Sequence, residues 1–153
     1  AKLGIQLSHA GRKGSAERPW EGRGALKGGA AWETVAASPI PFGAGWHVPK
    51  EATRDDMNAI RDAFVAATGR VLRLGFDELE MHAAHGYLLH TFLSPLSNVR
   101  TDRYGGSFEN RARYPLEVIQ AVRAAWPAAK PMGVRLSVTD LQSRRAARVP
   151  RLL

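Results

Sequence analysis

The sequence predicts an α/β protein whose core is a parallel β-sheet covered by helices. Three observations support this fold class: strand-like and helix-like segments alternate, the strand-like segments are apolar, and each ends in polar residues. Strands joined through helices pair in parallel, with right-handed connections in nearly all proteins. The 153 residues, 44% of them hydrophobic and 24% charged, have the composition of a globular domain.

The first strand is expected within Leu3–Gly11, where apolar and polar residues alternate. The segment Lys13–Lys50 follows, rich in glycine and proline and carrying Trp20, Trp32 and Trp46. Loops of this length are generally lids or binding loops, so we expect a lid-like loop after the first strand. Its tryptophans indicate that it packs against the rest of the protein.

The first helix is predicted to begin after Thr53, a favourable N-cap residue followed by two aspartates in the first turn. Gly69 lies inside this helix at a cost of about 1 kcal/mol relative to alanine. Gly75 marks the end of the helix. Apolar residues recur at helical spacing, at Met57, Ile60, Phe64 and Val71 or Leu72.

A second strand, a loop, a second helix and a third strand complete the order of elements. The strands are expected at Phe76–Ala83 and within Pro131–Asp140, and the helix at Phe108–Trp126 after the N-cap Ser107. Arg111 and Arg113 are expected to brace the preceding loop. The apolar stripe of the helix is predicted to comprise Leu116, Ile119, Val122 and Trp126.

Two architectures have this order of elements, a doubly wound sheet and a (β/α)8 barrel. A doubly wound sheet normally carries a glycine-rich ligand-binding turn after its first strand, and neither GxGxxG nor GxxxxGK[ST] occurs here. In a barrel, polar residues at the carboxyl ends of successive strands converge on one mouth. We therefore predict part of a (β/α)8 barrel, since polar pairs end all three strands: Gln6 and His9, His82 and His85, and Arg135 and Asp140.

The net charge of +8 does not predict nucleic-acid binding, because of where the basic residues lie. Four arginines lie in the last thirteen residues, 141–153, and without them 18 basic residues face 14 acidic ones. No basic run with interleaved aromatic residues occurs. No membrane span or signal peptide is recognisable, so we expect a cytoplasmic protein with no membrane partner. The absence of cysteine excludes disulfides and thiolate metal sites from this chain.

The spacing of His82 and His85 leaves three interpretations open: metal ligands, structural residues, or donors in an organic active site. No carboxylate or third histidine stands at a recognised ligand spacing, so no metal is expected. Glu80 lies two residues before His82 in the same predicted strand, so both side chains should face the barrel interior. A carboxylate in this position needs a hydrogen-bonding or ionic partner. Arg12 and Lys13 follow the first strand and lie either near the ligand mouth or on the exposed surface.

Four stretches resemble the old yellow enzyme family of flavin-dependent ene-reductases, especially its bacterial xenobiotic reductases and NADPH dehydrogenases. They are "GIQLSHAGRK", "RPWEG", "HAAHGYLLHTFLSPLSNVRTDRYGGSFENRAR" and "GVRLSVTD". The resemblance extends from Leu3 to Asp140 and corresponds to strands three to five of the family's barrel. It implies FMN as cofactor, NAD(P)H as reductant and an enone or xenobiotic as substrate.

The resemblance also implies a role for each matching residue. Gln6 and Arg135 match the family's flavin-binding glutamine and arginine. His82 and His85 match the pair that binds the substrate carbonyl oxygen, and some relatives have asparagine at the second place. Tyr87 matches the tyrosine that protonates the substrate. His90 is expected to be structural.

A complete barrel needs about 250 residues, so we expect a partial barrel domain at 1–140, truncated relative to the family. The tail 141–153 does not match and is interpreted as a frameshift or truncation. The intact protein is expected to reduce C=C bonds of α,β-unsaturated carbonyl compounds and to form a homo-oligomer. Alternatives are an inactive half-barrel that binds flavin or a partner chain, and a metal-dependent barrel hydrolase.

Overall fold

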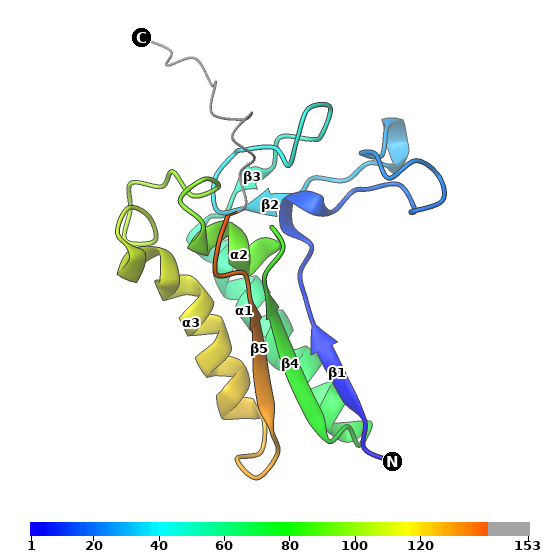
Figure 1. Cartoon of the computed structure of the whole chain (residues 1–153), viewed down its shortest axis with the longest axis vertical. Helices are drawn as coiled ribbons and strands as arrows, with labels where there is room; N and C mark the ends of the chain where they lie inside the picture. The colour runs from blue at the N-terminus through cyan, green and yellow to red at the C-terminus, as the bar shows by residue number, and fades with distance from the viewer. Residues whose placement is uncertain (141–153) are drawn as a thin grey trace.

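The computed structural model describes residues 1–140. Their central feature is a three-stranded parallel sheet in the order β1-β4-β5 (Figure 1). The strands are β1 (Gly4–Leu7), β4 (Glu78–Ala83) and β5 (Met132–Leu136), all within the predicted segments. The alternating α/β order is confirmed. The predicted tail lies outside the described residues.

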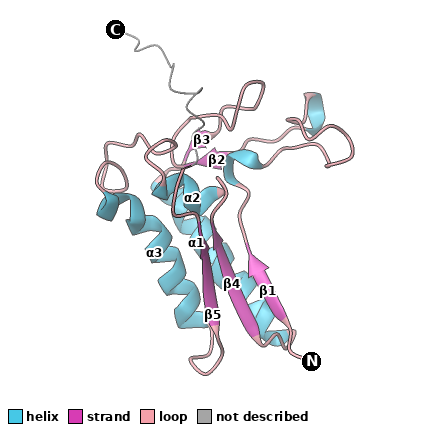
Figure 2. Ribbon diagram, in the orientation of Figure 1, coloured by secondary structure: helices cyan, strands magenta, loops and turns pink. Residues whose placement is uncertain are grey.

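Two long helices connect the strands, as Figure 2 shows. They are α1 (Arg54–Arg73), between β1 and β4, and α3 (Phe108–Ala125), between β4 and β5. Thr53 caps α1 in a capping box with Asp56, so the predicted start is confirmed. Ser107 caps α3 by accepting from the Asn110 amide at 3.3 Å.

One face of the sheet is apolar and packs against both helices. Leu79 and Met81 of β4 are fully buried on this face. Burying a large apolar side chain contributes roughly 1.5–3 kcal/mol, so this layer is the main stabilising element. The helices contribute Met57, Phe64, Val71, Val118 and Val122 to the same core.

The buried stripe of α3 differs from the predicted one. Val122 is buried as expected, and so is Trp126 directly after the helix, but Leu116 is 50% exposed. Tyr114 and Val118 are buried instead. The Tyr114 hydroxyl donates to the Met57 carbonyl at 3.0 Å, which joins α3 to α1. The prediction for Leu116 was wrong because several apolar rows of this helix have the same period, and only packing selects one.

The loop expected after the second strand contains a short helix, α2 (Leu88–Leu93). Four of its six residues are buried. Its N-cap, Tyr87, makes no side-chain capping bond, and the helix is only six residues long. Helices this short depend on tertiary packing and lack a strong periodic signal, which explains why the sequence did not reveal it.

The lid-like segment is more ordered than a plain loop. It contains two short parallel strands, β2 (Val35–Ala36) and β3 (Lys50–Glu51). The 3₁₀ turns η1 (Gly11–Lys13) and η2 (Gly28–Ala30) add local order. The expectation that its tryptophans pack on the protein is wrong for two of them, because Trp20 is 78% and Trp32 57% exposed.

Arg100 joins this segment to the loop before α3. Its guanidinium donates to the carbonyl oxygens of Ala37 and Ala52, at 3.0 and 2.9 Å. It also pairs with Asp102 at 2.6 Å, while its own side chain is only 7% exposed. Arg111 and Arg113 brace the same loop by donating to backbone carbonyls, as predicted.

Within residues 1–140, no helix combines the length and the apolar character that a membrane span requires.

Candidate active site

The second face of the sheet is polar, and no helix of residues 1–140 covers it. Side chains of paired residues in parallel strands point to the same side. The register pairs Gln6 with Glu80 and His82 with Arg135, so these four side chains share this face. Gln6 and Arg135 are exposed, whereas His82 is only 4% exposed. All three strands thus deliver polar groups to one surface, as the barrel prediction requires.

His82 is held as a neutral imidazole whose Nε2–H can donate. Its Nδ1 accepts a hydrogen bond from the Ala84 amide at 3.2 Å, so the ring proton is on Nε2. Burial lowers the pKa of His82, and the nearby His85 and Arg135 lower it further. The lowered pKa favours the neutral form, which carries one donor and no net charge.

His85 lies in an unusual backbone conformation at the tip of the strand. Its φ is +57°, and the next residue, Gly86, has φ +75°. The left-handed region is unfavourable for a residue with a β-carbon, so surrounding groups must hold His85 there. The His85 amide donates to the Ser137 hydroxyl at 3.0 Å, and the Gly86 amide donates to His90 Nδ1 at 2.8 Å.

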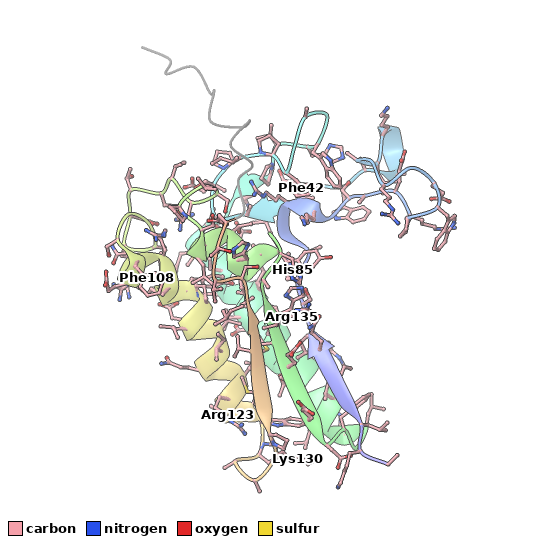
Figure 3. The ribbon with its side chains drawn as sticks, in the orientation of Figure 1. Phe42, His85, Phe108, Arg123, Lys130 and Arg135 are labelled. Atoms are coloured by element: carbon pink, nitrogen blue, oxygen red, sulfur yellow. The ribbon has the colours of Figure 1, made fainter. Side chains whose placement is uncertain are left out.

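This turn brings three aromatic rings together. The His82 and His85 rings are edge to face with centroids 5.1 Å apart, and the His82 and Tyr87 rings are edge to face at 4.8 Å. His85 is exposed and Tyr87 half-buried, so both are accessible at the strand ends. In Figure 3, His85 lies beyond Arg135 along the strand direction. The structure therefore places the three predicted catalytic residues in one cluster.

Gln6 and Glu80 form a hydrogen bond across β1 and β4. The Gln6 amide nitrogen donates to the Glu80 carboxylate, so the partner expected for Glu80 is present. The Gln6 carbonyl oxygen remains an acceptor on the open face, and Arg135 supplies a cationic donor fork there. A flavin ring edge carries both donors and acceptors, so the residues present are suited to hold FMN.

His90 is a structural residue in this arrangement. Its Nδ1 accepts from the Gly86 amide, and its Nε2 lies 3.6 Å from the Asp140 carboxylate. Asp140 also accepts from the Ser94 hydroxyl at 2.6 Å, which ties the segment after β5 to the C-terminal end of α2. His90, Ser94 and Asp140 border a cavity of about 390 Å³, which Ser137 also lines. His9 makes a similar local bond, with its Nδ1 accepting from the Gly11 amide at 3.1 Å.

Sequence reasoning did not resolve the position of Lys13 and missed that of Arg100. Lys13 Nζ donates to the His85 carbonyl at 2.7 Å. Arg12 turns away and donates to the carbonyls of Ile40 and Pro41. Lys13, Arg12 and Arg100 each bind backbone carbonyls that are distant in the sequence. No local pattern could therefore reveal their partners.

Among residues 1–140, no group of three or more histidine, cysteine, aspartate or glutamate side chains is placed to hold a metal ion. In this part of the chain, no further side chain could therefore join His82 and His85 as a third metal ligand.

Parallel strands, covering helices and polar strand ends define this chain as part of a (β/α)8 barrel. The sequence matches the NADH:flavin oxidoreductase / NADH oxidase family over residues 1–149, and the chain belongs to this family. The resemblance to old yellow enzymes is confirmed, and the family's cofactor is FMN. The match extends past Asp140, and the domain boundary placed there stays a prediction.

Two similar proteins are oxidoreductases by name. An NADH:flavin oxidoreductase from Gibberella zeae is 52% identical over 144 residues, which cover 91% of this chain and 35% of the relative. An NADPH dehydrogenase from Clostridium acetobutylicum is 46% identical over 140 residues, covering 92% of this chain and 38% of the relative. The chain thus spans little more than a third of the length of these curated relatives.

Solved structures agree with this assignment. Morphinone reductase superimposes with a TM-score of 0.72 at 31% identity, over 89% of this chain and 38% of its own. A structure of morphinone reductase in complex with tetrahydroNAD has the same TM-score at 33% identity. The shared fold confirms that the strands and helices described above are part of a barrel.

Proposed function

We propose that the protein containing this chain is an FMN-dependent NAD(P)H oxidoreductase that reduces the C=C bond of α,β-unsaturated carbonyl compounds. The observation that carries the proposal is the cluster of His82, His85 and Tyr87 beside the polar open face. When bound, FMN accepts reducing equivalents from NAD(P)H and delivers hydride to the β-carbon of the substrate.

The two histidines supply donors to the carbonyl oxygen of the substrate. Negative charge develops on this oxygen during reduction, and fixed N–H groups stabilise it because they need no reorganisation. His82 contributes Nε2–H, since its Nδ1 is occupied by the Ala84 amide. His85 stands next to it with an exposed ring. Each such donor typically accelerates the reaction about 100- to 1000-fold.

Tyr87 supplies the proton that completes the reduction at the α-carbon. Its ring packs edge to face against His82, which fixes its direction. A positioned general acid contributes about 100- to 10,000-fold in rate. The half-buried position of Tyr87 keeps it within reach of a substrate held by the two histidines.

Gln6 and Arg135 hold the flavin on the open face. Glu80 orients the Gln6 amide, so the Gln6 carbonyl oxygen faces outward as an acceptor. The Arg135 guanidinium would favour negative charge on a reduced flavin bound at this face. A cytoplasmic location and assembly into a homo-oligomer complete the proposal.

A flavin titration of the purified protein that contains this chain tests the proposal. Quenching of FMN fluorescence measures binding, and anaerobic NADPH followed by 2-cyclohexenone measures the two half-reactions through the flavin visible band. Bleaching by NADPH and recolouring by the enone support the proposal. Binding followed by bleaching, without recolouring, contradicts the enone as substrate.

A second candidate is a non-catalytic half-barrel that binds flavin or a partner chain. Among residues 1–140, β1 and β5 each pair on one side only, which leaves two sheet edges open. This candidate predicts FMN binding without bleaching by NADPH. If the chain does not bind FMN, it is not a half-barrel that binds flavin, and a partner chain is the remaining ligand of this candidate.

A further inference from the structure

Lys13 extends from η1 across the tip of β4. Its ammonium donates to the His85 carbonyl at 2.7 Å, across a separation of 72 residues. Its side chain also lies along Gly86, where an added β-carbon would stand 3.3 Å from Lys13 Cε. The lysine therefore contacts the two consecutive residues whose backbone is left-handed, His85 and Gly86.

This turn is held by side chains from three separate segments. Ser137 accepts from the His85 amide, and His90 accepts from the Gly86 amide. Lys13 is the only charged group of the three, and it binds the His85 carbonyl, which the other two leave free. A charge-assisted hydrogen bond is stronger than a neutral one, so Lys13 is expected to be the main restraint on the His85 peptide.

The same ammonium contacts Phe42, a residue farther along the lid-like segment. It lies 4.2 Å from the centroid of the Phe42 ring and 5.4 Å from that of Tyr87. Cations attract the faces of aromatic rings, so Lys13 lies between a lid residue and the proposed proton donor. Figure 3 shows Phe42 above His85 at this end of the sheet. Burial lowers the pKa of Lys13, and the neighbouring Arg12 lowers it further.

We propose that Lys13 is a positioning residue of the active site. It holds His85 in the left-handed conformation that presents its imidazole beside His82, and it couples the lid residue Phe42 to Tyr87. The inference rests on the proposed function for its catalytic consequence, whereas the conformational restraint is a property of the chain alone.

The test compares Lys13→Met, which keeps the length but removes the charge, with Lys13→Arg, which keeps a donor. Lys27→Met is the matched control, because Lys27 is exposed in the same lid-like segment. The first measurement uses NMR on the flavin-free chain. The one-bond Cα–Hα coupling of His85 reports the sign of φ, and cross-peaks from the side chain at position 13 to the Phe42 and Tyr87 rings report the lid contact.

Lys13→Met is expected to shift the His85 coupling toward the value for negative φ and to weaken the Phe42 cross-peaks. Lys13→Arg is expected to restore both, and Lys27→Met to change neither. An unchanged His85 coupling in Lys13→Met would overturn the inference. Unchanged near-UV circular dichroism of Trp126 and the core tyrosines confirms that the variant is folded.

The second measurement uses the FMN-loaded protein. Lys13→Met is expected to lower kcat for enone reduction at least tenfold while the KM for NADPH stays within twofold, and Lys13→Arg is expected to recover most of kcat. An equal loss in Lys13→Arg would contradict positioning through the carbonyl. Failure of the wild-type protein that contains this chain to bind FMN would overturn the proposed function and leave the NMR comparison to decide on Lys13.

Discussion

His85 shows how a single residue combines a chemical role with a structural demand. Its side chain is a proposed carbonyl donor, while its backbone has φ +57°. The sequence indicated the first property through the resemblance of "HAAHGY", but not the second. Asparagine provides an N–H donor and also tolerates the left-handed region, which gives a physical reason for its presence at this place in relatives.

His85→Ala and His85→Asn should therefore differ. In the FMN-loaded protein, His85→Ala should lower kcat/KM for 2-cyclohexenone about 100- to 1000-fold, as expected for the loss of one oxyanion donor. His85→Asn should keep kcat/KM within about tenfold, because the donor remains and the backbone is not strained further. Steady-state kinetics checks this. Equal losses of kcat/KM in the two variants would show that hydrogen-bond donation by His85 does not contribute to the rate.

Gly105 is required for packing rather than for backbone freedom. A β-carbon at this position would overlap the carbonyl oxygen of Arg100. Gly105→Ala should lower the free energy of unfolding by at least 2 to 3 kcal/mol, at the upper end of typical point substitutions of about 0.5–3 kcal/mol. Gly29→Ala is the control, since a β-carbon there meets nothing within 4 Å. Urea unfolding curves check both, and equal stabilities would show that the loop adjusts freely.

At the scale of elements, the ends of α1 were predictable because capping is local. Thr53 accepts from the Asp56 amide at 3.1 Å, and Asp56 accepts from the Thr53 amide at 2.9 Å. The short helix α2 was not predictable because six residues carry little helical periodicity. The strands β2 and β3 were not predictable because two residues each are too few to show alternation. The apolar stripe of α3 was predicted correctly at Val122 and Trp126 and wrongly at Leu116.

The capping box makes stability dependent on acid. Hydrogen bonds from Thr53 and Lys50 lower the pKa of Asp56 from 3.8 to about 2. Because the pKa is lower in the folded state, the contribution of Asp56 is fully present above pH 3.8 and is lost as the pH falls through about 2. The free energy of unfolding should fall across this window, as measured by urea unfolding at each pH.

Asp56→Asn removes this titration, so its stability should depend less on pH in the same window. Asp55→Asn, which changes an exposed carboxylate outside the capping box, should retain the wild-type dependence. Parallel curves for wild type and Asp56→Asn would show that other carboxylates cause the acid sensitivity.

At the scale of the whole molecule, the sheet has one covered and one open face. The core layer between the sheet and helices α1 and α3 includes Leu79 and Met81, while Gln6 and Arg135 remain exposed on the other side. β4 is paired on both sides, by β1 and by β5. Stability should therefore be concentrated in β4 and in the helices behind it.

Amide hydrogen exchange of the purified chain checks this distribution. The amides of Leu79–Ala83 should exchange more slowly than those of Ile5–Leu7, because the central strand opens only when the sheet separates. α1 should be protected along its buried residues Met57, Phe64 and Val71. Equal protection of β1 and β4 would indicate that the open edge of β1 is covered in solution.

The sequence by itself determined the alternation of strands and helices and the helix caps, because these depend on residues close together in the chain. It also determined the family, because the matching stretches of sequence are long. The polar residues at the strand ends also followed from sequence, since parallel strands bring them to one edge. The tertiary structure alone decided which side chains meet there. Lys13 reaches His85, and Arg100 binds the carbonyls of Ala37 and Ala52, across 48 to 72 residues. Such contacts depend on how whole elements pack, and no local periodicity encodes them.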